Sequence, residues 1–191
     1  MPRGRRHALD PAQRLEDPEL LLQLAAGQLG ALGELYDRYQ APLRLFLLRA
    51  TRDAHDTDDL LHATFLAAAK SAARFDGRAS CRPWLVGIAV QLLRRRRRSF
   101  GHLLRVLGTL KDTQPVASDP RASLQARTDV ERALGQLSHA KRITLLMAEV
   151  EGMSCPEIAE ALDIPLGTVW TRLHAARREL RTALGAEAGE P

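Results

Sequence analysis

Residues 154–180, SCPEIAEALDIPLGTVWTRLHAARREL, contain two short amphipathic segments separated by a three-residue break, and this spacing constrains the fold more than any other feature. Ser154, with Glu157 three residues later, fits a capping box, and Pro156 suits the first turn of a helix. The inward positions of the two segments are apolar: Ile158, Ala159, Leu162, Val169 and Leu173. The stretch therefore predicts two packed helices joined by a tight turn.

The turn and the outer face of the second helix fit a helix-turn-helix, whose second helix enters the major groove of DNA. Asp163 stands in the turn where Gly is usual, and Asp tolerates left-handed backbone better than most residues. The outer face carries Trp170, Thr171 and His174, with arginines on its flanks. From spacing alone, an ordinary helical hairpin with a solvated arginine face remains the alternative.

The rest of the chain also favours helices, because aromatic residues make up only 4% and no long stretch alternates with period two. We expect breaks at Gly27 and Gly30, a helix end or kink at Pro42, and a new helix capped by Ser80. Residues 108–123, rich in Thr, Ser, Asp and Pro, read as a flexible linker. The predicted fold is all-α, with two small helical domains joined by a flexible linker and the C-terminal domain a helix-turn-helix.

The predicted boundaries divide the chain into five parts: an N-terminal tail (1–18), a first domain (19–102), a linker (103–126), a second domain (127–184) and a C-terminal tail (185–191). The net charge of +5 is unevenly distributed. Residues 1–126 hold 20 basic and 13 acidic residues, whereas residues 127–191 hold 8 and 10. The basic surplus indicates an acidic partner such as nucleic acid, although the part with the helix-turn-helix, residues 127–191, is itself mildly acidic.

Catalytic and metal-binding patterns do not assemble in this sequence. The six histidines are scattered, and Cys81 and Cys155 lie far apart without ligand-like neighbours, which favours reduced cysteines in a cytosolic protein. We expect no enzyme activity, no cofactor and no metal site. The N-terminus lacks the apolar core of a secretory signal, and no apolar run approaches a membrane span, so we expect a cytoplasmic protein without membrane insertion.

Two parts of the chain resemble bacterial extracytoplasmic-function sigma factors. LSHAKRITLLMAEVEGMSCPEIAEALDIPLGTVWTRLHAARREL resembles their region 4, with matches at Gly167, Thr168, Val169, Arg172, Leu173, Arg177 and Leu180. LYDRYQAPL and DTDDLLHATFLAAAKSAARFDGRASCRPWLVGIA resemble their region 2, with matches at Asp58, Asp59, Leu60, Phe65, Leu66, Phe75, Ser80, Arg82, Trp84, Leu85, Ile88 and Ala89. Together the two signatures cover about 35–100 and 127–184, in the order of the family.

The resemblance implies that a helix over 57–74 docks on the clamp helices of the RNA polymerase β′ subunit. The polymerase-binding candidates are Asp58, Asp59, Leu60, His62, Phe65 and Leu66. The alternative for Phe65 and Leu66 is that these side chains belong to the hydrophobic core. His62-Ala63 stands where the family usually has Gln-Glu, which removes one acidic contact.

The resemblance also implies that a loop at about 76–82 receives a base flipped from the −10 element, while the following helix contacts DNA. The candidates for this region are Arg78, Ser80, Arg82, Trp84, Gln91, Arg94, Arg95, Arg96, Arg97 and Arg98. The alternative for Trp84 is that it is a core residue. The alternative for the arginine run is that it is a solvent-exposed helix face. Val90-Gln91 replaces the common Arg-Asn, so we expect a base preference different from the family norm.

The −35 element would lie against the second helix of the helix-turn-helix. The candidates are Thr168, Trp170, Thr171, Arg172, His174, Arg177 and Arg178. Trp170 and Ala175 stand where the family often has basic side chains, so we expect weak DNA binding by this lobe alone. Trp170 can pack on thymine methyl groups, or it can contact a protein such as the polymerase flap or an anti-sigma factor.

The resemblance thus implies a transcription initiation factor that directs core RNA polymerase to promoters through their −35 and −10 elements and assists melting. Its expected partners are core RNA polymerase, through the β′ clamp helices and β flap, promoter DNA and an anti-sigma factor. One alternative is a degenerate sigma-like regulator that binds polymerase or an anti-sigma factor without initiating. Another is a stand-alone helix-turn-helix regulator, against which the N-terminal signature argues.

Overall fold

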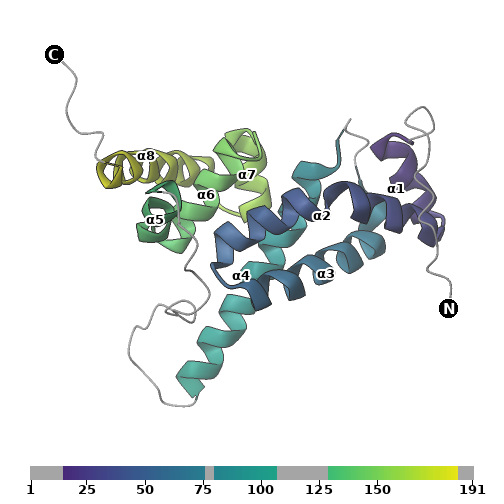
Figure 1. The fold of residues 1–191 in the computed structure, drawn as a ribbon, viewed down its shortest axis with the longest axis horizontal. Helices are drawn as coiled ribbons and strands as arrows, with labels where there is room; N and C mark the ends of the chain where they lie inside the picture. The colour runs from purple at the N-terminus through teal and green to yellow at the C-terminus, as the bar shows by residue number, and fades with distance from the viewer. Residues whose placement is uncertain (1–14, 76–79, 107–128, 185–191) are drawn as a thin grey trace.

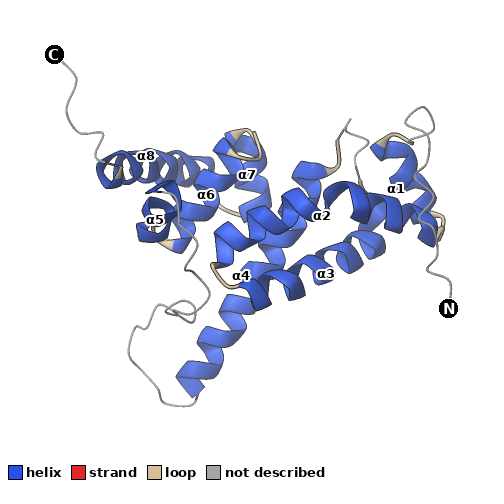
Figure 2. Cartoon of the chain, in the orientation of Figure 1, coloured by secondary structure: helices blue, strands red, loops and turns tan. Residues whose placement is uncertain are grey.

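The computed structural model describes residues 15–75, 80–106 and 129–184, and these residues form helices and short connections without a strand (Figures 1 and 2). In chain order the elements are α1 (Asp17–Ala25), α2 (Leu29–Thr51), α3 (Ala54–Ser71), the 3₁₀ turn η2 (Ala72–Arg74), α4 (Arg82–Val106), α5 (Asp129–Gln136), α6 (His139–Glu149), α7 (Cys155–Leu162) and α8 (Leu166–Ala183). The first four α-helices form one lobe and the last four a second lobe. The all-α, two-lobe prediction is confirmed.

Helix α2 is longer than the sequence indicated. The break at Gly27 is present, with a left-handed backbone at φ 85°, but Gly30 and Pro42 both lie inside one uninterrupted helix. The sequence predicts a helix end or a kink at Pro42, and the end is wrong. Proline removes one backbone donor, but the turn that follows buries Phe46 and Leu47 in the core, and this packing outweighs the local cost.

The carboxylate of Asp17 joins three segments of the first lobe. Asp17 begins α1 and is 2% exposed. It accepts hydrogen bonds from the Tyr39 hydroxyl, from Arg38 Nη1 at 2.6 Å and from the Cys81 backbone nitrogen at 2.7 Å. Burial alone would raise the pKa of Asp17, but the hydrogen bonds from Tyr39, Cys81 and Arg38 together hold it below its usual value. The start of α4 is thereby fixed against α1 and α2.

The second lobe has the predicted helix-turn-helix at α7 and α8. Ser154 and Glu157 form the expected capping box at the start of α7. Asp163 ends α7 in a left-handed conformation, at φ 49°, as its place in the turn required. Val169 and Leu173 are buried beneath α8. The local signals in this part of the sequence are thus confirmed.

The two lobes pack directly against each other. Helix α4 contacts α7, and α2 contacts α6. A Cβ placed on Gly87 of α4 would lie 3.7 Å from the Cβ of Ala161 on α7, so the small residue permits a close approach. Helix α4 also continues to Val106, past residue 102, where the sequence places the end of the first domain.

We predict that Asp17→Asn lowers the free energy of unfolding by about 3 kcal/mol, because removal of one partner leaves Arg38 without its buried counter-charge. The contribution of the charge is fully present above the ordinary carboxyl pKa of about 4 and is lost as pH falls through the lowered pKa of the folded state. Urea unfolding at pH 7 and pH 3 measures both effects. The matched control is Asp37→Asn, an exposed aspartate on α2; an equal loss in both variants would contradict the assignment.

Candidate polymerase and nucleic-acid interface

Helix α3 carries an exposed face of acidic and apolar side chains. Asp58 receives a hydrogen bond from Arg44 Nε at 2.7 Å, which lowers its pKa. Asp59 is half exposed, and the Leu66 side chain is 61% exposed. His62 is exposed, with its Nδ1 atom 2.8 Å from the carbonyl oxygen of Asp58. Asp58, Asp59, His62 and Leu66 are therefore available to a partner.

Two other candidates on α3 are buried and are not available to a partner in this structure. Leu60 and Phe65 are 3% and 4% exposed and belong to the core of the first lobe, where the Phe65 ring lies 4.9 Å from the ring of Tyr36. The expectation that these two residues supply apolar contact area for polymerase is corrected by their burial. A helix of this length has one buried face, and Leu60 and Phe65 lie on it.

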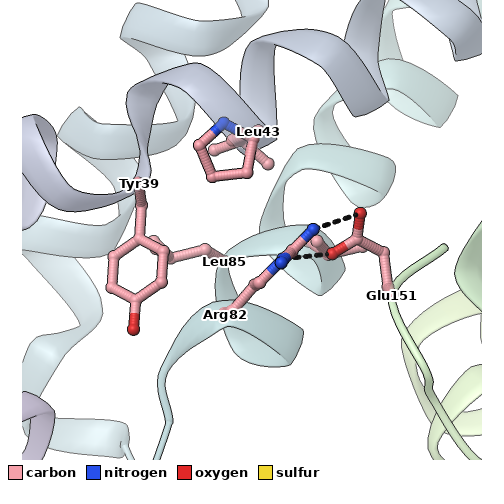
Figure 3. A pocket seen from close by; sticks show the side chains of 7 residues that line it. Tyr39, Leu43, Arg82, Leu85 and Glu151 are labelled. Carbon is pink, nitrogen blue, oxygen red and sulfur yellow. Dashed lines mark hydrogen bonds and ion pairs between the residues drawn. The ribbon is translucent and has the colours of Figure 1, made fainter.

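The residues at the start of α4 are held by both lobes. Arg78 lies outside the described residues, and Ser80 is exposed. Arg82 donates from Nε to Glu151 Oε2 at 2.7 Å and from its terminal nitrogen to Oε1 at 3.2 Å (Figure 3). The Glu151 side chain is 1% exposed, whereas that of Arg82 is 39% exposed. This pair closes one side of a pocket that Tyr39, Pro42, Leu43, Leu85 and Val86 also line.

Further along α4, some of the residues that the sequence marks as relevant to DNA binding are buried and others are exposed. Trp84 is partly buried and packs edge-on against Phe75, with ring centroids 5.5 Å apart, so it belongs in part to the core. Val90 is fully buried and its neighbour Gln91 is exposed. Of this pair, therefore, only Gln91 presents its side chain to a ligand in this arrangement.

The arginine run continues the outward face of α4. Arg96 pairs with Asp56 at 2.6 Å and with Asp59 at 3.4 Å on α3. Arg95, Arg97 and Arg98 are exposed, and Arg94 is half-buried. The run is thus largely a solvent-facing cationic strip, of which one member is tied to the acidic face of α3.

Helix α8 presents the predicted reading face. Trp170 is 59% exposed, and Thr171, His174 and Arg178 are exposed beside it. Thr168 and Arg172 are half-buried. Arg177 donates to Glu149 Oε1 at 2.7 Å and 2.9 Å, so one of the predicted DNA contacts already has an acidic partner.

Sequence reasoning missed the carboxylates that hold these arginines. Glu151 lies in the connection between α6 and α7, which has no motif of its own, and it is 69 residues from Arg82. Glu149 and Asp56 likewise have no signal in the sequence beyond their charge. Only the packing of the two lobes identifies the pairing of Glu151.

No group of three or more His, Cys, Asp or Glu residues in 15–75, 80–106 and 129–184 could hold a metal ion. No helix in the same part of the chain is long and apolar enough to cross a membrane.

Comparison with protein families places both halves of the chain. The Sigma-70 region 2 family matches residues 35–101, and the Sigma-70, region 4 family matches residues 127–180. The ECF RNA polymerase sigma factor SigM of Mycobacterium tuberculosis is 32% identical over 170 residues, which span 88% of this chain and 85% of that protein.

Two solved structures have a similar fold. The structure of CnrH in complex with the cytosolic domain of CnrY matches with a TM-score of 0.60 and 27% identity, over 90% of this chain and 99% of that one. The sigma factor RpoE in complex with the anti-sigma factor NepR from Bartonella quintana matches with a TM-score of 0.62 and 20% identity, over 89% and 96%. With both sigma regions in order and a curated relative matched along most of its length, the chain belongs to the extracytoplasmic-function family of RNA polymerase sigma factors.

Proposed function

We propose that this protein is a transcription initiation factor that binds core RNA polymerase in the cytoplasm and directs it to promoters through their −35 and −10 elements. The observation that carries the proposal is that one chain combines an acidic, apolar face on α3 with an outward-facing helix-turn-helix on α8. A stand-alone helix-turn-helix regulator has no need of the first face. An enzyme is not proposed, because the family acts by binding.

Polymerase binding is assigned to the exposed part of α3. Asp58 and Asp59 supply negative charge, and Leu66 supplies an exposed apolar side chain about two turns further along the same helix. An exposed leucine rimmed by polar groups is typical of an interface. Leu60 and Phe65 support this surface from below and make no direct contact.

Promoter binding is assigned to α4 and α8. The exposed members of the arginine run would contact phosphates without reading sequence. Trp170, Thr171, His174 and Arg178 would face the −35 element. Arg82, in contrast, is occupied by Glu151, so a role of Arg82 at the −10 element requires the two lobes to separate locally.

An anti-sigma factor is the proposed regulatory partner. In the similar solved structure, CnrH is in complex with the cytosolic domain of CnrY. In this chain, Trp170 is the most exposed large apolar side chain on α8. Leu66 is the most exposed large apolar side chain on α3. A partner that covered either side chain would block one of the two proposed functional faces.

Leu66→Asp should abolish co-purification with core polymerase, because a charge placed within the proposed interface is costly to bury. The fold should remain, since Leu66 is 61% exposed, and circular dichroism checks this. The matched control is Leu22→Asp, which alters a 71% exposed leucine on α1. If Leu66→Asp still co-purifies at wild-type levels, the α3 assignment is wrong.

Glu151→Gln should raise the equilibrium constant for separation of the lobes by on the order of tenfold, because Gln offers the charged Arg82 one neutral carbonyl acceptor in place of a bidentate carboxylate. Energy transfer between dyes attached to α1 and α8 reports the separation, and binding to a −10 strand should rise in parallel because Arg82 is released. Glu160→Gln, an exposed glutamate on α7, is the control. Unchanged energy transfer in Glu151→Gln would refute the role of this ion pair.

Trp170→Ala should lower promoter-specific transcription several-fold while polymerase binding is retained, because the lost contact is with DNA. Trp170→Arg should raise general DNA affinity and shift the preference towards guanine, since an Arg–guanine pair contributes about 1–3 kcal/mol of discrimination. Transcription with core polymerase on templates randomised at the −35 element measures both changes.

The control for Trp170 is Val130→Ala, which trims an exposed apolar side chain elsewhere in the same lobe. If Trp170→Ala keeps full activity and base preference but loses a protein partner, Trp170 belongs to a protein interface. Failure of the wild-type protein to start transcription on any template, despite polymerase binding, would favour the degenerate regulator.

A further inference from the structure

The junction of the two lobes gathers arginines from three helices. Arg52 ends α2 in a left-handed conformation and donates from Nη1 to the Gly135 carbonyl oxygen of the second lobe at 3.1 Å. Arg142 of α6 is 7% exposed. Its buried Nε atom has no hydrogen-bond partner in the described part of the chain.

The charges that act on Arg142 are positive. Burial, Arg52 and Arg97 together lower the pKa of Arg142 to about 10, so the guanidinium remains charged at neutral pH. Arg97 comes from α4 and is exposed, and its charge acts on both Arg142 and His139. Within residues 15–75, 80–106 and 129–184, no carboxylate pairs with Arg142. Arg82, which also lies at the lobe boundary, is instead paired with the buried carboxylate of Glu151.

His139 lines the same junction from the first turn of α6. Both of its ring nitrogens are buried without a hydrogen-bond partner among the described residues. Burial and the charges of Arg97 and Arg142 lower the pKa of His139 to about 3. His139 is therefore neutral at pH 7 and offers an N–H donor without adding charge.

An unpaired buried cation is costly, and the cost is removed when an anion accepts its hydrogen bonds. We propose that the junction of the two lobes binds a phosphate-type oxyanion, held by Arg52, Arg97 and Arg142. Guanidinium groups match the oxygens of such an anion in pairs, and the exposed Arg97 gives it a route from solvent. Because Arg52 and Arg97 come from one lobe and Arg142 from the other, the bound anion stabilises the packed arrangement of the lobes.

Thermal unfolding of the full chain in potassium phosphate and in potassium chloride, at equal ionic strength and pH 7, tests the site. Ligand that binds only the folded state raises the midpoint in a saturable manner. We expect a saturable rise in phosphate that chloride does not reproduce. A nucleoside monophosphate, tested in the same way, distinguishes a site for the free anion from one that also accepts a phosphate monoester. An equal rise in chloride would overturn the proposal, because it would mean charge screening alone.

Variants separate binding from folding. Arg142→Gln should raise the midpoint in the absence of phosphate, since it removes an unpaired buried charge, and should abolish the response to phosphate. Arg97→Gln should weaken phosphate binding by roughly tenfold, which corresponds to one charge-assisted contact. Arg95→Gln, from the exposed part of the same arginine run, is the matched control and should respond as the wild type does. A full phosphate response in Arg142→Gln would overturn the site.

Discussion

The arrangement of the first lobe depends on the hydrogen bonds that the carboxylate of Asp17 accepts. They come from a tyrosine and an arginine of α2 and from the backbone that leads into α4. A buried carboxylate is tolerated only when its oxygens are satisfied, so these donors must stay in place together. The first turn of α4, with Arg82 and Trp84, is therefore held at a fixed position relative to α1 and α2.

Helix α4 connects the two proposed functions because both lobes use its surface. Helix α4 packs against α3 and α7, and its arginine run is largely exposed to solvent. The pairing of Arg82 with Glu151 shows that the second lobe occupies part of the surface assigned to the −10 element. If Arg82 acts at the −10 element as proposed, promoter contact and lobe packing use the same side chain, and DNA binding then depends on the relative position of the lobes.

Sequence signals predicted best where the physics is local. The capping box at Ser154 and the left-handed Asp163 depend on residues within one or two turns, and both are present. The helix end that the sequence allowed at Pro42 is absent, because burial of nearby α2 residues outweighs a local penalty. At Leu60 the resemblance implied a contact, but packing places the side chain in the core. Motif matching identifies which positions matter in a family, yet it does not say which of them face inward.

By itself, the sequence determined the helical class, the two lobes, the helix-turn-helix and the outward position of Trp170, because helix periodicity and capping act over short distances. Only the tertiary structure decided that Arg82 meets Glu151, that Arg96 meets Asp56, and that Arg142 is buried beside other arginines. These relations join residues far apart in the chain. Their electrostatic energies depend on burial and distance, neither of which can be read from residue order.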